Sequence, residues 1–315
     1  MILRLKSKIK TLWLILVLQI FLSDILYSKW EEGIPLPKAK SGTVATTIDD
    51  NIYVLGGKGI IGTSPLSEIY DFKGKIWRPI SIFPKETQGF RVIKFGNQIF
   101  LCGGFDGENI TNSCWIYDDT LSNWSESEPM PFARTEHVMV KIDNEVFILG
   151  GAGESLDMMM SYNLLTRKWS YNSLNFDTLP YSSGFNSFNN KIAIVGGINI
   201  SNNMTTNIFV TYDPKLKEWK KNMNYPLNIS SSSVQQIGKK LHVVGGKSLN
   251  PNKTFDSHFS FYEGVWKSRK PLPTPRHDMS SALVKGNWFI IGGAISPGVF
   301  SLFSPTDVVE VYSEK

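Results

Sequence analysis

The stretch NIYVLGG, residues 51–57, is a short apolar run that ends in two glycines. The same pattern returns five times, as QIFLCGG, EVFILGG, KIAIVGG, KLHVVGG and NWFIIGG. The first glycines of the six pairs are Gly56, Gly103, Gly150, Gly196, Gly245 and Gly292, at spacings of 47, 47, 46, 49 and 47 residues. This regularity predicts six structural repeats over nearly the whole chain.

A second marker follows each glycine pair. In four repeats a tyrosine is followed by a tryptophan seven positions later: Tyr70 and Trp77, Tyr117 and Trp124, Tyr162 and Trp169, Tyr212 and Trp219. The fifth repeat shortens the interval, with Tyr262 followed by Trp266. A proline-containing turn then leads into another apolar segment, so each repeat predicts four short strands. Such a sheet cannot bury both faces alone, and radial stacking with aromatic side chains between neighbours is the expected solution.

The glycine pair, the tyrosine and the tryptophan together resemble the kelch repeat over residues 29–315. The resemblance implies an all-β fold, a six-bladed kelch-type β-propeller. The arginine that kelch repeats often place before the first strand is kept only as Arg134 and Arg276.

The chain ends on DVVEVYSEK, residues 307–315, and no tryptophan follows Tyr312. The segment SKWEEGIPLP, residues 28–37, reads as the missing fourth strand with its tryptophan, Trp30. We therefore expect the N-terminal strand to join the C-terminal blade and close the ring, which also removes an exposed sheet edge.

The N-terminus predicts export. Four basic residues within the first ten precede the apolar run TLWLILVLQIFL, residues 11–22, as in a secretory signal. We assign residues 1–28 to a signal peptide, cleaved after Ser28 or retained as an anchor, and residues 29–315 to the propeller. Both alternatives predict a secreted or periplasmic protein. In an oxidising compartment Cys102 and Cys114 can form one local disulfide or remain free thiols.

The charge balance argues against some partners. The formal charge of +5 falls to +2 after residue 28, because 29 basic and 27 acidic residues remain (33 − 4 and 28 − 1). We expect no nucleic-acid ligand, no membrane contact beyond the N-terminal segment, and a monomer.

The variable loops point to one face of the disk as the binding face. The loops after the glycine pairs vary in length and share a face with the turns before the innermost strands, and such variation is typical of a binding face. Candidate binding residues on that face are Asp106, Arg134, Glu136, His137, Glu154, Arg276, His277 and Asp278. Arginine and histidine beside carboxylates could hold a carboxylate or a sugar acid. The alternative for each residue is a structural role in joining blades.

Six Asn-x-Ser/Thr sequences are glycosylation candidates if the source is eukaryotic: Asn109, Asn123, Asn199, Asn203, Asn228 and Asn252. Nothing in the spacing of the four histidines and two cysteines identifies a metal or cofactor site, and we expect none.

Two functions remain open from the sequence. The first is an exported module that binds a protein or a glycan through the variable loops, without catalysis. The second is a sugar-acid isomerase similar to the exported kelch-type sialic acid mutarotases, with the Arg134 and Arg276 clusters meeting in one pocket. The sequence names no ligand, because propellers host unrelated activities.

Overall fold

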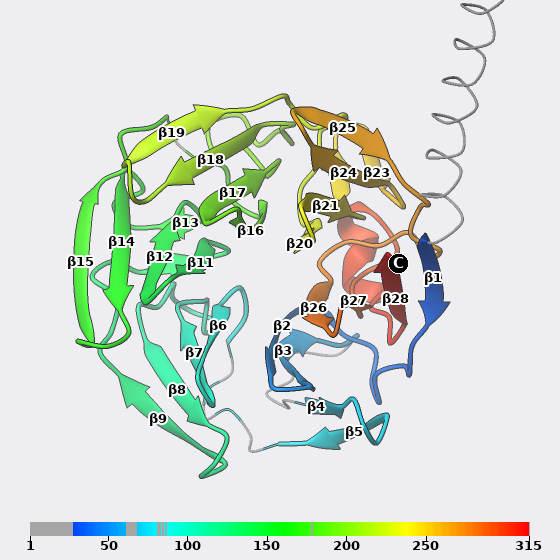
Figure 1. The fold of residues 1–315 in the computed structure, drawn as a ribbon, viewed down its shortest axis with the longest axis horizontal. Helices are drawn as coiled ribbons and strands as arrows, with labels where there is room; N and C mark the ends of the chain where they lie inside the picture. The colour runs from blue at the N-terminus through cyan, green and yellow to red at the C-terminus, as the bar shows by residue number, and fades with distance from the viewer. Residues whose placement is uncertain are drawn as a thin grey trace, which may run out of the picture.

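The computed structural model describes residues 28–60, 68–80, 83, 85, 87–177 and 179–314. These residues form six four-stranded antiparallel sheets arranged radially around a channel (Figure 1). The six-bladed propeller is therefore confirmed. The signal segment predicted for residues 1–28 lies, apart from its last residue, outside the described residues.

The blades follow one another along the chain, and the first five run from their innermost to their outermost strand. Blade 1 contains β2 (Ser41–Ile48), β3 (Asn51–Lys58), β4 (Glu68–Asp71) and β5 (Ile76–Pro79). Blade 2 contains β6 (Arg91–Phe95), β7 (Gln98–Cys102), β8 (Cys114–Asp118) and β9 (Asn123–Ser127). Blade 3 contains β11 (Val138–Ile142), β12 (Glu145–Leu149), β14 (Met158–Asn163) and β15 (Lys168–Ser173).

Blade 4 contains β16 (Gly184–Phe188), β17 (Lys191–Val195), β18 (Phe209–Asp213) and β19 (Glu218–Lys221). Blade 5 contains β20 (Ser233–Ile237), β21 (Lys240–Val244), β24 (His258–Tyr262) and β25 (Val265–Ser268). Blade 6 contains β26 (Ser280–Val284), β27 (Asn287–Ile291), β28 (Val309–Glu314) and β1 (Ser28–Glu32). Five short elements belong to the loops: the pair β10 (Arg134–Thr135) and β13 (Ala152–Gly153), the pair β22 (Lys247–Leu249) and β23 (Asn252–Thr254), and the 3-10 helix η1 (Gly298–Phe303).

The ring closes through the N-terminal strand, as predicted. Strand β1 pairs with β28, and Trp30 lies opposite Tyr312. The Trp30 ring is buried against Tyr312 and Trp288 of its own blade and His258 of blade 5. Blade 6 is thus built from both ends of the chain, and its outermost strand leaves no gap at the seam (Figure 1).

The aromatic markers occupy one position in every blade, as cross-strand pairs such as Tyr162 opposite Trp169. Blade 5 departs from the expectation, because Phe261 rather than Tyr262 lies opposite Trp266. The shorter turn in this blade moves the paired position by one residue, and Tyr262 pairs with Val265 instead.

The tryptophans also connect neighbouring blades. Five indole N–H groups donate, at 2.8–3.0 Å, to main-chain carbonyls that follow the outermost strand of the preceding blade. The donors are Trp30, Trp77, Trp169, Trp219 and Trp266, and the acceptors are Lys270, Ile34, Glu128, Leu174 and Met223. Each of these tryptophans therefore packs between two neighbouring blades, and its indole N–H has a hydrogen-bond acceptor there.

The glycine pairs are the points where the next blade's backbone crosses. In four blades the N–H of the second glycine donates, at 2.7–2.8 Å, to a carbonyl of the next blade: Gly104 to Arg134, Gly197 to Ile229, Gly246 to Arg276 and Gly293 to Lys40. A Cβ on the first glycine of these pairs would lie within 2.6 Å of the same carbonyl oxygen. Glycine is required here because a side chain would separate the two blades.

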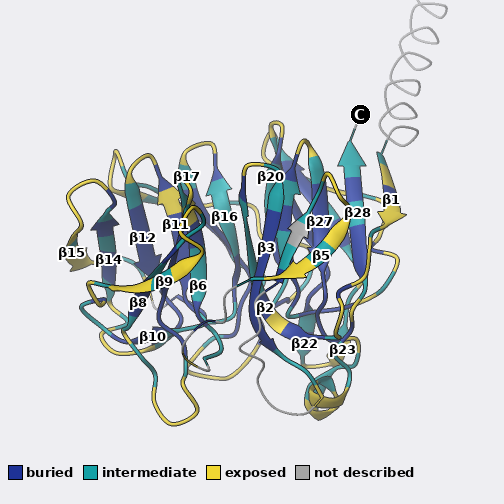
Figure 2. Cartoon of the chain, turned by 90° about the horizontal axis from the view of Figure 1, so that it is seen from below, coloured by how far each residue is buried: buried dark blue, intermediate teal, exposed yellow. Residues whose placement is uncertain are grey.

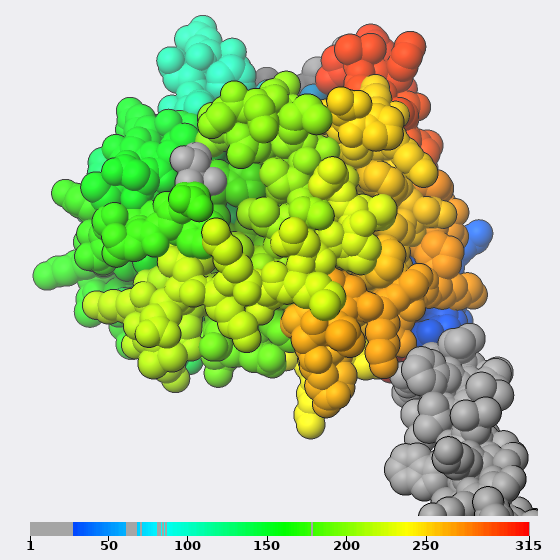
Figure 3. All heavy atoms as spheres, turned by 90° about the horizontal axis from the view of Figure 1, so that it is seen from above, coloured from blue at the N-terminus to red at the C-terminus, as the bar shows by residue number. Residues whose placement is uncertain are grey.

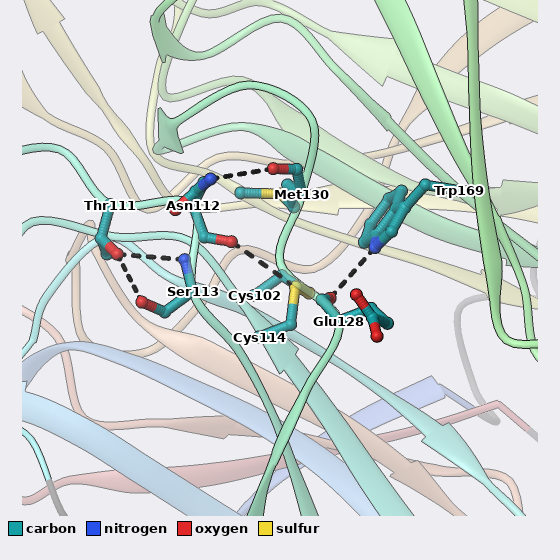
Figure 4. The surroundings of a disulfide bond; sticks show 8 residues. All are labelled: Cys102, Thr111, Asn112, Ser113, Cys114, Glu128, Met130 and Trp169. Atoms are coloured by element: carbon teal, nitrogen blue, oxygen red, sulfur yellow. Dashed lines mark hydrogen bonds between the residues drawn. A yellow bond between two sulfur atoms is a disulfide. The ribbon is translucent and has the colours of Figure 1, made fainter.

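A disulfide joins Cys102 and Cys114 across β7 and β8 (Figure 4). It lies in the apolar cluster between blades 2 and 3, with Met130 and the partly buried Trp169. Both cysteines are fully enclosed, so the bond acts as part of the packed interior as well as a covalent link.

Deletion of residues 29–33 should destabilise the ring far more than an ordinary terminal truncation, because it removes β1 and the buried Trp30. Loss of the indole alone should cost about 3–5 kcal/mol in the free energy of unfolding. Urea unfolding of the deletion variant measures the effect, with Lys29→Ala as an exposed control. An unchanged unfolding midpoint in the deletion variant would show that β1 does not close the ring.

Gly245→Ala should destabilise the protein more than Gly238→Ala. Both glycines have positive φ, 63° and 56°, but a Cβ at Gly245 would lie 2.6 Å from the Arg276 oxygen while one at Gly238 meets nothing within 4 Å. We expect roughly 1 kcal/mol for the backbone strain in both variants and a further 1–3 kcal/mol at Gly245. Equal unfolding free energies would contradict the proposed role of the glycine pair.

Candidate functional site

The two faces of the disk differ as predicted. We call the loop face the one that carries the connections from second to third strand and the turns that enter the innermost strands. The turn face carries the tight hairpins and the strand ends Ser28 and Glu314, which are cross-strand partners. Figure 2 shows β22, β23 and η1 on the loop face, opposite the C-terminus.

A channel of about 1020 Å³ runs between the innermost strands. Residues from all six blades line it, and serine, threonine and charged side chains predominate near the loop face. Ligands bind in concave cavities of this size, where a few convergent polar groups fix the orientation of the ligand.

A belt of six equivalent residues forms the mouth of the channel on the loop face. Its members are Gly42, Gly89, Glu136, Ser182, Ser231 and Asp278, with φ between 50° and 70°. Main-chain hydrogen bonds of 2.7–3.4 Å run from the N–H of one member to the carbonyl of a neighbouring blade's member at five junctions. Because most of these backbone groups are used within the ring, the side chains of the belt are its main groups available to a ligand.

The side chains of the belt place two carboxylates on opposite sides of the mouth, in blades 3 and 6. Glu136 accepts a hydrogen bond from the hydroxyl of Ser182. Asp278 accepts hydrogen bonds from Lys247 Nζ at 2.9 Å and from His277 Nδ1 at 2.7 Å. Burial alone would raise the pKa of Asp278, but Lys247 and His277 outweigh it and lower the pKa, so the group is a carboxylate at neutral pH.

Arg91 adds a positive charge inside the channel. Its guanidinium donates at 3.0 Å to the carbonyls of Phe90 and His137, both neutral acceptors. It lies 5.6 Å from the ring centre of Phe185. Burial lowers the pKa of Arg91, and the carboxylates of Glu136 and Asp278 partly offset that effect.

The structure corrects the expectation for Arg134 and Arg276. Both side chains are fully buried, in blades 3 and 6, on opposite sides of the ring. Arg134 donates to the carbonyl of Ser155, and Arg276 forms an ion pair of 2.9 Å with Glu310. Burial lowers the pKa of each to about 10. They therefore hold the loops and strands of their own blades and do not reach the channel.

His137 and His277 are likewise buried and lie next to the mouth rather than in it. Neither ring nitrogen of His137 has a hydrogen-bond partner among the described protein groups. His277 lies between Asp278 and the carbonyl of Ser296, 3.1 Å from its Nε2, and orients the carboxylate. Of the predicted candidates, Glu136 and Asp278 line the mouth.

Asp106 and Glu154 lie on exposed loop tips of blades 2 and 3. The Asp106 carboxylate accepts the main-chain N–H groups of Asn109 and Glu108, which lowers its pKa. Glu154 accepts the N–H of Ala133 at 3.1 Å. Both carboxylates stabilise their own loops and remain accessible from solvent.

Arg91, Ser182 and Ser231 were missed by sequence reasoning. Ser182 and Ser231 occupy the belt position, six residues before the end of an innermost strand, and Arg91 lies two residues after it, so an alignment of the six repeats around that position would have found them. Ser182 and Ser231 are common small residues, and Arg91 is a single charge without a charged neighbour in the sequence, so none of them forms a recognisable motif.

No group of three or more His, Cys, Asp or Glu side chains in the described part of the chain is placed to hold a metal ion. Within the same residues, no helix combines the length and apolar character needed to cross a bilayer.

A model of the Attractin/LZTR1 β-propeller matches residues 52–295. The chain belongs to this family. This chain is 26% identical over 245 residues to Kelch-like protein 40 of Xenopus laevis, and the match covers 72% of this chain and 39% of the relative. It is 24% identical over 258 residues to Kelch-like protein 35 of Mus musculus, covering 79% and 42%. Putative protein tag-53 of Caenorhabditis elegans is 22% identical over 298 residues, covering 82% and 22%.

These relatives confirm the kelch resemblance. The chain spans less than half the length of each of them. The match covers only the propeller part of these relatives, so it does not transfer the activities of the whole relatives to this chain.

Two further histidines are buried at the seam between blades 5 and 6. His242 Nδ1 lies 2.9 Å from His258 Nε2, and His258 Nδ1 lies 3.1 Å from the Lys270 carbonyl, which also accepts the Trp30 indole. Burial lowers the pKa of His242 to about 2 and of His258 to about 3. Both are neutral packing groups, and their enclosure keeps them from acting as acid or base.

The buried histidines should make stability fall as pH falls below about 6.5, because the unfolded state gains protons there that the folded state does not. Each histidine with a lowered pKa should remove about 2 kcal/mol of unfolding free energy between pH 7 and pH 5. Phenylalanine occupies the position of His242 in blades 2, 3 and 6. His242→Phe should therefore weaken the pH dependence by about that amount, measured by urea unfolding at both pH values. The same pH dependence in variant and wild type would exclude this origin.

Proposed function

We propose that this propeller is an exported binding module that takes a protein or glycan ligand at the channel mouth on its loop face. The main observation that supports this proposal is the belt, in which four blades place Glu136, Ser182, Ser231 and Asp278 around one opening. Hydroxyl and carboxylate groups in a ring suit hydrogen bonding to a polar ligand.

Gly42 supports this proposal. A Cβ at Gly42 would meet nothing within 4 Å, and the equivalent positions of other blades carry Glu, Ser and Asp at similar φ. A side chain is therefore sterically tolerated at Gly42, and its absence leaves the blade 1 side of the mouth open.

Export is part of the proposal. Its support is the apolar segment of residues 11–22 and the disulfide between Cys102 and Cys114, since such bonds persist in oxidising compartments.

The sugar-acid mutarotase considered from the sequence required the two arginine clusters to meet in one pocket. Arg134 and Arg276 are buried on opposite sides of the ring, so no observation favours that activity. We assign no catalytic step to the site.

Gly42→Trp should block the mouth without unfolding the protein. Gly238→Trp is the matched control, because Gly238 has similar φ and free space but lies in a hairpin on the turn face. Both variants and wild type should be screened on a glycan array and against candidate protein ligands. We expect Gly42→Trp to lower affinity at least tenfold, or about 1.4 kcal/mol, with little change in the control. Equal affinity of all three for a ligand would show that it binds elsewhere.

A further inference from the structure

The loop of blade 6 carries an apolar protrusion. The helix η1 (Gly298–Phe303) exposes 72% of Val299, 68% of Phe300, 49% of Leu302 and 69% of Phe303, and none of its residues is buried. Figure 2 shows this helix projecting from the loop face. Residues 294–306, AISPGVFSLFSPT, contain no charged side chain. Four large apolar groups within five residues differ from scattered exposed apolar residues and mark an interaction site.

The base of this protrusion is fixed. The N–H of Thr306 donates to Gly293 at 2.8 Å, and that of Ser296 donates to the Ser304 hydroxyl at 2.9 Å. Gly298, with φ of 61°, leaves room for Asn252 of the neighbouring blade beside it. The apolar tip is thus held in place before any partner binds, which reduces the ordering cost of docking.

The opposite part of the loop face carries four exposed carboxylates, with Lys85 near one of them, Asp106. Asp106 and Glu108 are exposed on the blade 2 loop, and Glu154 and Asp157 on the blade 3 loop. Figure 3 shows the blade 2 loop, turquoise, and the blade 6 loop, red, as two separate protrusions. A partner that contacts both therefore meets apolar groups on one side of the face and carboxylates on the other.

We propose that η1 is the apolar anchor of a protein-docking surface, and that the partner combines an apolar pocket for Phe300 and Phe303 with a basic patch facing Asp106 and Glu108. This rests on the proposed binding role of the loop face and names the class of partner. A protein is favoured over a lipid surface because a flat bilayer that contacts η1 across the loop face would also bring the carboxylates of the blade 2 and blade 3 loops toward its anionic headgroups. Charge complementarity of the acidic loops steers such a partner and fixes its orientation.

The first strand of the propeller begins, and its last strand ends, on the face opposite η1. Ser28 and Glu314 lie together on the turn face, so whatever precedes Ser28 is attached on the side away from η1. The docking surface therefore points outward if the N-terminal segment is retained as an anchor.

A photo-crosslinking amino acid, p-benzoylphenylalanine, placed at residue 300 of the full chain in its producing cells tests the proposal. The same amino acid at Leu121 is the control, because Leu121 is equally exposed, at 68%, on a turn-face hairpin. We expect a discrete protein adduct from position 300 and none from position 121. The adduct should fall at least about fivefold with Asp106→Asn and Glu108→Gln together, and when crosslinking is done in an extract of the same cells brought to 0.5 M salt, because both weaken attraction to a basic patch.

No adduct above the Leu121 level, or an adduct indifferent to the carboxylates and to salt, overturns the proposal. The proposal is also overturned if the purified protein floats with phosphatidylcholine vesicles and a Phe300→Ser, Phe303→Ser double variant does not, since η1 would then be a lipid contact.

The channel mouth is tested separately by Gly42→Trp. An adduct that persists in Gly42→Trp, beside unchanged ligand binding in that variant, would leave the anchor standing while the mouth proposal fails.

Discussion

The close approach of backbones at the glycine pairs is the constraint on which the propeller depends. The second glycine donates its N–H to the next blade, and the first leaves room for the accepting carbonyl. A hydrogen bond between blades at this point sets their separation near the channel. The tryptophan indoles set the separation again at the rim. At four of the six junctions the blades are therefore held both near the axis and far from it.

The same constraint determines which side chains can serve a ligand. The carbonyls of Arg134 and Arg276 accept hydrogen bonds from the glycine pair of the preceding blade. The guanidinium groups of the same two residues are buried in their own blades. Two residues later the chain reaches the belt, where φ is positive and the side chain lines the opening. Structural and exposed positions thus alternate over two or three residues, which is why Arg134 and Glu136 have different roles.

The architecture could be predicted from the sequence because repetition amplifies weak signals. One glycine pair alone predicts little, but six pairs at nearly constant spacing, with Trp30 as the missing partner of Tyr312, predict a closed six-bladed ring.

The site could be predicted only in part. Glu136 and Asp278 were found because they carry charge, whereas Ser182 and Ser231 are ordinary residues whose importance comes from a backbone conformation. The burial of Arg134 depends on three-dimensional contacts that spacing does not report. Tyr262 was misassigned because a shortened turn moved the aromatic position to Phe261.

The pairing of Ser28 with Glu314 has a consequence for the chain as a polymer. These residues begin the first strand and end the last strand of the propeller and are cross-strand partners in one sheet, so the ring of blades is interrupted at a single hairpin position. A short peptide linking them would make the backbone order of the blades circular, and the cut could be moved to the equivalent hairpin of another blade. What the ring requires is the correct neighbour on each side of every blade, and which blade comes first along the chain is incidental.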